Sequence, residues 1–217
     1  MLKLMFAVVI AATACDRARS ERNGQSSQDR LPPLAKETLT DTQRDAVARF
    51  AAGRGKEPFG PFVPLLRSPD LMLAAQSMGD YLRFKSPLSP RLREMAVLLA
   101  CRAWAQEYEW AVHYPLALQA GLRHEIVDAI ASGRRPFGID QEEEAAYDLV
   151  FEILYNKRVS DPTWRRATQS LGESGVVDLL GTAGYFSFVA VVLNAARTPA
   201  PPGAPPLQLI PDLRRSR

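Results

Sequence analysis

The sequence of 217 residues predicts an all-α helical bundle. Between residues 34 and 197 apolar residues recur at helical spacing, and no run alternates with the period of two that a strand requires. Helix-starting and helix-ending residues also come at regular intervals. With 47% hydrophobic and 24% charged residues, the chain can bury a full core without disulfides or metals. Collagen-like, wholly disordered and multi-pass membrane proteins are therefore excluded.

The predicted helices begin at capping signals. In three of them a capping residue is followed by a proline or, three positions on, by a glutamate. These signals are Ser89-Pro90, the pair Asp140 and Glu143, and Asp161-Pro162. Two helices end at a glycine, Gly121 or Gly172. The expected ranges in chain order are 40–52, 71–84, 89 to about 106, from there to 119, 140–155, 161–172 and 179–196.

Residues 179–196 carry no charged side chain, and this uncharged stretch is long enough to be a transmembrane candidate. The segment also contains small and polar residues, namely Gly181, Thr182, Gly184, Ser187 and Asn194. Its hydrophobic core is shorter than a bilayer. We therefore expect a fully buried helix whose small residues allow neighbours to approach closely, including neighbours across a subunit boundary. A membrane span is the alternative.

The N-terminus is typical of an export signal. Residues 1–14 join a short positive start to the apolar stretch LMFAVVIAA, which is too short to span a bilayer and is followed by small residues. Cys15 comes next, and small residues leading into a cysteine resemble a bacterial lipobox. We expect an exported protein on the periplasmic or cell-envelope side, attached to the membrane only through a lipid anchor at Cys15. The alternative is ordinary signal cleavage near Ala14, which leaves a free thiol.

Two polar segments flank the predicted domain. Residues 15–33 contain one large apolar residue, Leu31, and predict a disordered tether. Residues 34–197 form the globular domain, and residues 198–217 form a proline-rich tail. The net charge of +3 divides into +2 before residue 34, −1 in the domain and +2 in the tail. Because the excess positive charge lies at the ends, we expect no nucleic-acid partner.

Polar residues lie on apolar faces of two adjoining predicted helices. Glu94 shares its face with Cys101, and a carboxylate on such a face is costly unless it is paired or protonated. In the next helix Glu109 and His113 are four residues apart, with Gln106 one turn earlier. A Glu–His pair at this spacing can raise the imidazole pKa and transfer protons near neutral pH. A polar network that only joins the two helices is the alternative.

The same stretch gives little indication of metal or thiol chemistry. Two cysteines, at 15 and 101, exclude a Cys-x-x-Cys redox pair and a multi-cysteine zinc site. Glu-x-x-x-His also differs from the Glu-x-x-His spacing of ferritin-like sites, so we expect no metal and no cofactor. The nearby aromatic residues belong either to the core or to a ligand site. Gln106 and Trp110 are the candidate substrate-binding residues.

Residues 89–122, SPRLREMAVLLACRAWAQEYEWAVHYPLALQAGL, resemble the carboxymuconolactone decarboxylase family, which includes the alkylhydroperoxidase D-type disulfide reductases. The resemblance continues through GYFSFVAVVLNA and covers roughly residues 34–210. It implies an alkylhydroperoxidase D-like helical bundle that assembles as a homo-trimer or homo-hexamer, with sites near subunit interfaces.

The peroxidase branch resembles the pattern E-(x)11-C-x-x-C-x-x-x-H. Glu94 and His113 match its acid and its histidine, but Gln106 and Glu109 stand at its two cysteines. Peroxide reduction by that route needs an attacking and a resolving thiol, which these side chains cannot supply. The decarboxylase branch lacks the cysteines and has a histidine at the position of His113. There, loss of carbon dioxide from a lactone acid leaves a dienolate that must be protonated at carbon.

The resulting hypothesis is an acid–base enzyme that acts on a small carboxylated or lactone-like substrate. Glu94, Glu109 and His113 are its candidate catalytic residues. One alternative is a non-catalytic exported binding or scaffold protein that keeps the fold. Another is redox chemistry of a single thiol, Cys101, which requires an accessible thiol of low pKa.

Overall fold

A computed structural model describes residues 28–202 and 207. Over these residues the fold is all-α, as predicted, and they contain no strand. The elements in chain order are η1 (Lys36–Thr38), α2 (Asp41–Arg54), α3 (Phe62–Leu65), α4 (Pro69–Phe84), α5 (Pro90–Ala103), α6 (Glu107–Gln119), α7 (His124–Ala131), α8 (Gln141–Phe151), the π-helical turn η2 (Glu152–Asn156) and α9 (Asp161–Ala196). The predicted signal at 1–14, Cys15 and most of the tail lie outside the described residues.

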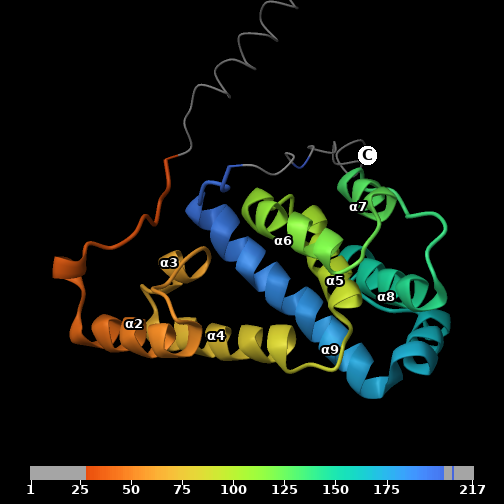
Figure 1. The fold of residues 1–217 in the computed structure, drawn as a ribbon, viewed down its shortest axis with the longest axis horizontal. Coiled ribbons are helices and arrows are strands. Elements are labelled where there is room, and N and C mark those ends of the chain that lie inside the picture. The colour runs from red at the N-terminus through yellow and green to blue at the C-terminus, as the bar shows by residue number, and fades with distance from the viewer. Residues whose placement is uncertain (1–27, 203–206, 208–217) are drawn as a thin grey trace, which may run out of the picture.

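Helix α9 crosses the middle of the molecule (Figure 1). It packs against α5 and α8 on one side and against α3 and α4 on the other, while α6 and α7 pack on α5 and α2 packs on α4. One continuous hydrophobic core joins these helices. Its largest fully buried side chains include Phe50 of α2, Met95 of α5, Trp110 of α6 and Leu179 of α9.

Two of the three predicted capping signals lie at helix starts as expected, whereas α9 is capped by Ser160 and not by Asp161, the Ser160 hydroxyl accepting from the backbone of Thr163 at 3.4 Å. Ser89 caps α5, with its hydroxyl accepting a hydrogen bond from the backbone of Leu92 at 3.4 Å. Asp140 and Glu143 form a reciprocal capping box on α8, with hydrogen bonds of 2.9 and 3.0 Å. Each bond satisfies a backbone N–H that has no partner within its helix.

The turn between α5 and α6 differs from the prediction. We expected the helix that starts at residue 89 to run to about residue 106, but α5 ends at Ala103. Ala105 adopts a positive φ of 48°, and the backbone N–H of Gln106 donates to the carbonyl of Cys101 at 2.8 Å. This sharp reversal makes Gln106 the N-cap of α6 and sends α6 back along α5.

Helix α9 has 36 residues and contains a kink at Gly172, where φ is 69° and ψ is 165°. The predicted helix end at Gly172 is therefore a kink, after which the helix resumes at once. By length and composition α9 could cross a membrane, since an 18-residue window has a mean hydropathy of 1.9. It nevertheless packs against four other helices, and 56% of that window is buried.

The expectation that 179–196 is fully buried was wrong. Val191 is 44% exposed, and Val177, two turns before Gly184, is 62% exposed. Val177, Gly184 and Val191 lie seven residues apart, so they form one stripe along α9. Exposed Met78 and Tyr81 lie on α4, and the Tyr81 hydroxyl donates to the Asp178 carboxylate at 3.2 Å. We call the exposed residues Leu71, Met78, Tyr81, Val177, Gly184 and Val191 the α4–α9 apolar face.

The ordered domain extends beyond the predicted limits of 34–197. The backbone N–H of Arg30 donates to the carbonyl of Ala196 at 2.7 Å, and its guanidinium donates to the carbonyl of Ala195 at 3.3 Å. Arg67 donates to the carbonyl of Pro32 at 2.7 Å. Leu207, ten residues past the predicted limit, is 3% exposed and belongs to the core.

Candidate active site

The hairpin of α5 and α6 brings Glu94 and His113 together. Their positions are nearly symmetric about the turn, so the two side chains meet between the helices. Nδ1 of His113 lies 2.6 Å from Oε2 of Glu94, while Nε2 lies 3.5 Å from Oε2 of Glu109. All three residues are buried, at 5% exposure or less. The imidazole therefore lies between two carboxylates, in an arrangement that we call the Glu–His–Glu line.

The two carboxylates change the acidity of the imidazole. Burial lowers the pKa of His113, but hydrogen bonding and charge from Glu109 and Glu94 outweigh it and raise the pKa to about 8. The histidine is therefore protonated at neutral pH and can both donate and recover a proton. The edge-on Phe186 ring of α9, 4.9 Å away between centroids, also contacts the imidazole.

Two members of the Glu–His–Glu line open on a cavity of about 50 Å³. His113 and Glu109 line it, whereas Glu94 lies behind the imidazole. The remaining lining residues come from α2, the loop before α3, α3, α4, α6 and α9: Arg54, Phe59, Pro61, Phe62, Arg83, Tyr108, Val112, Tyr185, Phe186 and Val189. At roughly 10–15 Å³ for each water, the cavity has room for a few waters or a small organic group.

The two predicted substrate-binding residues lie elsewhere. The Gln106 amide oxygen accepts hydrogen bonds from the backbone N–H groups of Tyr108 and Glu109, the latter at 3.1 Å, and its amide nitrogen donates to Asn194 at 2.9 Å. Trp110 is 2% exposed and packs in the core. Neither side chain is among those that line the cavity. Gln106 thus acts as a helix cap, and through it α6 is attached to α9.

Cys101 lies behind the site without the properties of a reactive thiol. It is 1% exposed. Burial raises the pKa of its thiol well above the ordinary value, and the charges of Glu109 and Glu94 raise it further. A thiol that stays protonated is a poor nucleophile, so the geometry disfavours the single-thiol hypothesis.

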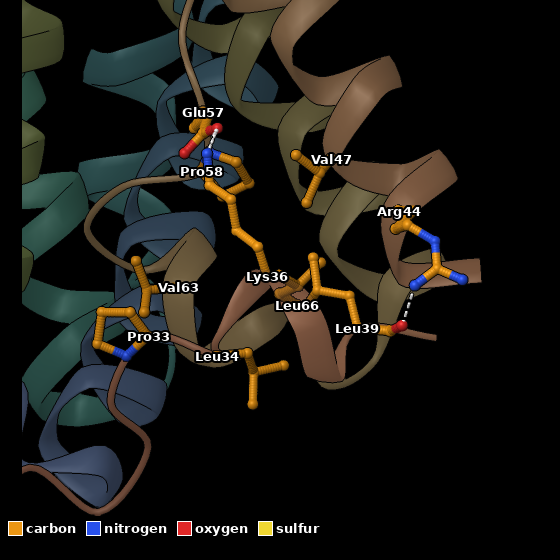
Figure 2. A pocket seen from close by; sticks show the side chains of 10 residues that line it. All are labelled: Pro33, Leu34, Lys36, Leu39, Arg44, Val47, Glu57, Pro58, Val63 and Leu66. Atoms are coloured by element: carbon orange, nitrogen blue, oxygen red, sulfur yellow. Dashed lines mark hydrogen bonds and ion pairs between the residues drawn. The ribbon is translucent and has the colours of Figure 1, made fainter. Parts of the chain in front are cut away.

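A larger cavity, of about 300 Å³, lies between the N-terminal segment and α2 and α3 (Figure 2). Its walls are mainly aliphatic and proline side chains, including Leu34, Val47 and Leu66. The ion pair of Lys36 and Glu57, at 2.6 Å, lies at its edge, and both side chains are more than half exposed. This cavity lacks a buried acid–base group, so the smaller cavity is the candidate active site.

Sequence reasoning did not find Arg54 or Tyr185, which complete the small cavity. They come from α2 and α9, the first and the last α-helices of the described sequence, and neither residue forms a spacing motif with Glu109 or His113. Across residues 28–202 and 207, no group of three or more His, Cys, Asp and Glu side chains is arranged to hold a metal ion.

In a comparison with protein families, residues 69–152 match the model of the carboxymuconolactone decarboxylase family. These residues include α4 to α8 and therefore all of the Glu–His–Glu line. Over this segment the chain is similar to the carboxymuconolactone decarboxylase family. Arg54 and Tyr185 lie outside the matched segment.

Solved structures of other proteins share this fold. One is a protein of unknown function from Agrobacterium tumefaciens, ATU0492, whose description connects it with the antioxidant defence protein AhpD. It is 15% identical, with a TM-score of 0.57 over 63% of this chain and 94% of its own. A cysteine-to-alanine variant of the debrominase Bmp8 in complex with 2,3,4-tribromopyrrole is 12% identical, with a TM-score of 0.63 over 82% of this chain and 95% of its own. The comparison with curated proteins found no match.

Proposed function

We propose that this protein is an acid–base enzyme that transfers a proton to or from a carbon atom of a small carboxylated or lactone-like substrate. One observation carries the proposal: two members of a buried Glu–His–Glu line, Glu109 and His113, lie on a cavity of about 50 Å³. A network that only joined two helices would not need this opening.

Each member of the line has a distinct role. Glu94 accepts a hydrogen bond from Nδ1 of His113, which fixes the ring and stabilises its charge. Nε2 then points toward Glu109 and the cavity. Glu109 and His113 are the catalytic residues, because both line the cavity, and Glu94 is a positioning residue.

The reaction that fits this line is a redox-neutral decarboxylation. The bond between the substrate and its leaving carboxylate breaks, carbon dioxide departs, and the electron pair enters the adjacent unsaturated system. The charged imidazole of His113 then gives its Nε2 proton to carbon, and the imidazole regains a proton from water. Proton donation by a positioned group contributes about 10²–10⁴-fold to the rate of such a reaction.

The test is turnover in deuterium oxide with a panel of small unsaturated lactone acids and β-keto acids. We expect carbon dioxide release with deuterium at the product carbon, and a loss of about 10²-fold or more in kcat for His113→Gln and Glu109→Gln. Cys101→Ala should retain the activity. In Glu94→Gln the basic limb of the pH profile of kcat should move to lower pH, because the pKa of His113 loses the contribution of Glu94.

The alternative is a non-catalytic binding or scaffold protein that keeps the fold. It would be favoured if no compound in the panel turned over, or if turnover were equal in the wild type and in His113→Gln. Peroxidase activity through paired thiols is not proposed, because Gln106 and Glu109 stand where that chemistry needs cysteines.

We further propose that the protein forms a homo-trimer or homo-hexamer through the α4–α9 apolar face. Val177 is 62% exposed, and exposed apolar residues gathered on one face are typical of protein interfaces. Val177→Glu should reduce the mass found by sedimentation velocity to that of a monomer. Phe137→Glu, which changes an exposed residue in the loop before α8, is the matched control. A monomeric wild type would contradict the proposal.

The location of the protein is also a proposal. Residues 1–14 support export, and the small residues before Cys15 support lipid attachment. In a bacterial host the full chain should fractionate with membranes, and Cys15→Ser should release it into the soluble envelope fraction. Membrane association that survives this substitution would contradict the lipid anchor.

A further inference from the structure

The small cavity has a second charged wall. Arg54, the last residue of α2, and Arg83, in the last turn of α4, line the same cavity as Glu109 and His113. Neither guanidinium is part of the Glu–His–Glu line. The cavity thus has an acidic wall that carries the imidazole and a basic wall at the ends of two other helices.

Arg54 is held firmly but has unused donors. Its side chain is 8% exposed, Nη2 lies 2.7 Å from Oδ1 of Asp80, and the guanidinium carbon is 5.1 Å from the centre of the Phe62 ring. Beyond this ion pair, Nε and Nη2 make no further hydrogen bond with any described residue. Leaving buried donors unmatched is unfavourable. A ligand with oxygen atoms in the cavity would satisfy them.

Cations outnumber carboxylates at this wall. Asp80 is the acid next to Arg54, whereas Arg83 adds a second positive charge to the lining. A wall with an excess of positive charge attracts anions into a cleft.

Tyr185 links the two walls. Its ring packs on Gly79 of α4, where an added Cβ would lie 2.5 Å from the hydroxyl oxygen. Burial raises the pKa of Tyr185 to about 12, while the charges of Arg54 and Arg83 lower it and those of Glu109 and Asp80 raise it. Arg54, Arg83, Glu109 and Tyr185 all line the one cavity, so a single small ligand can reach both walls.

We propose that Arg54 and Arg83 form a subsite for the carboxylate of a small organic acid, and that this carboxylate remains on the substrate while a different carbon reacts. The planar guanidinium offers pairs of N–H donors that match the two oxygens of a carboxylate. A carboxylate that departs as carbon dioxide loses its charge in the transition state, so a guanidinium holding it would stabilise the ground state more. The anchored group is therefore not the leaving group.

This assignment of substrate class rests on the proposed function in one respect: the claim that a different carbon of the bound acid reacts. Binding of the carboxylate needs no chemistry, so it can be measured separately. The probe is acetate, and acetamide is its neutral counterpart of equal size. Their binding to the full-length protein is followed by the NMR signals of the His113 ring and by the shift in melting temperature at constant ionic strength.

We expect acetate to bind and acetamide to bind at least about tenfold more weakly, because charge-assisted hydrogen bonds are the stronger ones. Arg54→Gln and Arg83→Gln should each weaken acetate binding by about tenfold or more. Arg49→Gln, on an exposed turn of α2, should leave it unchanged. If Arg54→Gln fails to fold, Arg54→Lys keeps a cation near Asp80 but loses the planar donor pair, and it should also bind acetate more weakly.

Three outcomes would overturn the subsite: no acetate binding by the wild type, equal binding of acetate and acetamide, or unchanged acetate binding in the folded arginine variants. The proposed function fails separately. If acetate binds through Arg54 but no carbon acid turns over, the subsite stands and the enzyme hypothesis falls. If turnover depends on His113 but acetate binding does not depend on Arg54, the enzyme hypothesis stands and the subsite falls.

Discussion

Titration of His113 should make the protein less stable at alkaline pH. The pKa of this imidazole rises from the ordinary value of 6.5 to about 8 in the folded protein, because Glu109 and Glu94 outweigh the effect of burial. A rise of this size corresponds to about 2 kcal/mol of folding free energy. Since the folded state binds the proton more tightly, that stability is fully present below about pH 6.5 and is lost as the pH passes through about 8.

Urea unfolding at about pH 6 and about pH 9 measures the difference. The free energy of unfolding of the wild type should fall by about 2 kcal/mol between these values. His113→Gln keeps a side-chain donor between the two carboxylates but cannot titrate, so its free energy of unfolding should change much less. His124→Gln, which alters the exposed histidine at the start of α7, should retain the full decrease.

An NMR titration supplies the direct check. The chain has two histidines, so the ring signal that His113→Gln removes identifies the buried imidazole. Its midpoint should lie near pH 8. A midpoint at or below 6.5, or an equal loss of stability in the wild type and His113→Gln, would refute the assignment of a charged imidazole between two carboxylates.

Three further predictions follow from packing and capping. Gly79→Ala should destabilise the protein by about 1–2 kcal/mol in urea unfolding, because the new Cβ would lie 2.5 Å from the Tyr185 hydroxyl. At Gly184 an added Cβ meets nothing within its own chain, so Gly184→Ala should be neutral or stabilising when the protein is monomeric. Equal effects of the two substitutions would contradict this packing. Cys101 in the native protein should resist iodoacetamide until denaturant is added, as read from the mass of its peptide, and rapid native labelling would show a thiol less buried than described. Gln106→Ala should lower the free energy of unfolding by about 1 kcal/mol through loss of the α6 cap, without changing acetate binding. A change in acetate affinity would instead place Gln106 in the ligand site.

The helix starts were predictable because they depend on neighbours in the sequence. Ser89, Asp140 and Glu143 satisfy backbone groups within one turn, so local chemistry decides where α5 and α8 begin. The turn after Ala103 was not predicted, because an alanine at positive φ carries no signal in its side chain. Tertiary packing sets that conformation.

The candidate site was predictable only in part, for the same reason. The spacing of Glu109 and His113 on one helix face is a local property and survived in the structure. The pairing of Glu94 with His113 depends on how α5 and α6 fold back on each other, so the sequence supplied the candidates and not the distance. Arg54 and Tyr185 reach the cavity from distant segments, and common residue types at unrelated positions give no pattern to detect.

The contacts of Arg30 bear on how the protein should be produced. If the predicted export signal is removed for expression in the cytoplasm, the sequence points to residue 34 as the start, because the domain was predicted to begin there. Such a truncation would delete the donors that bind the last carbonyls of α9 at Ala195 and Ala196. The preceding residue, Asn194, donates to the carbonyl of Trp104 at 2.8 Å and accepts from Gln106, so a frayed end of α9 would loosen the turn that positions Glu109 and His113. A shortened protein that begins no later than residue 28 keeps these contacts. If a protein that begins at residue 34 loses activity, the cause would be the loosened turn between α5 and α6 and not the absence of a membrane.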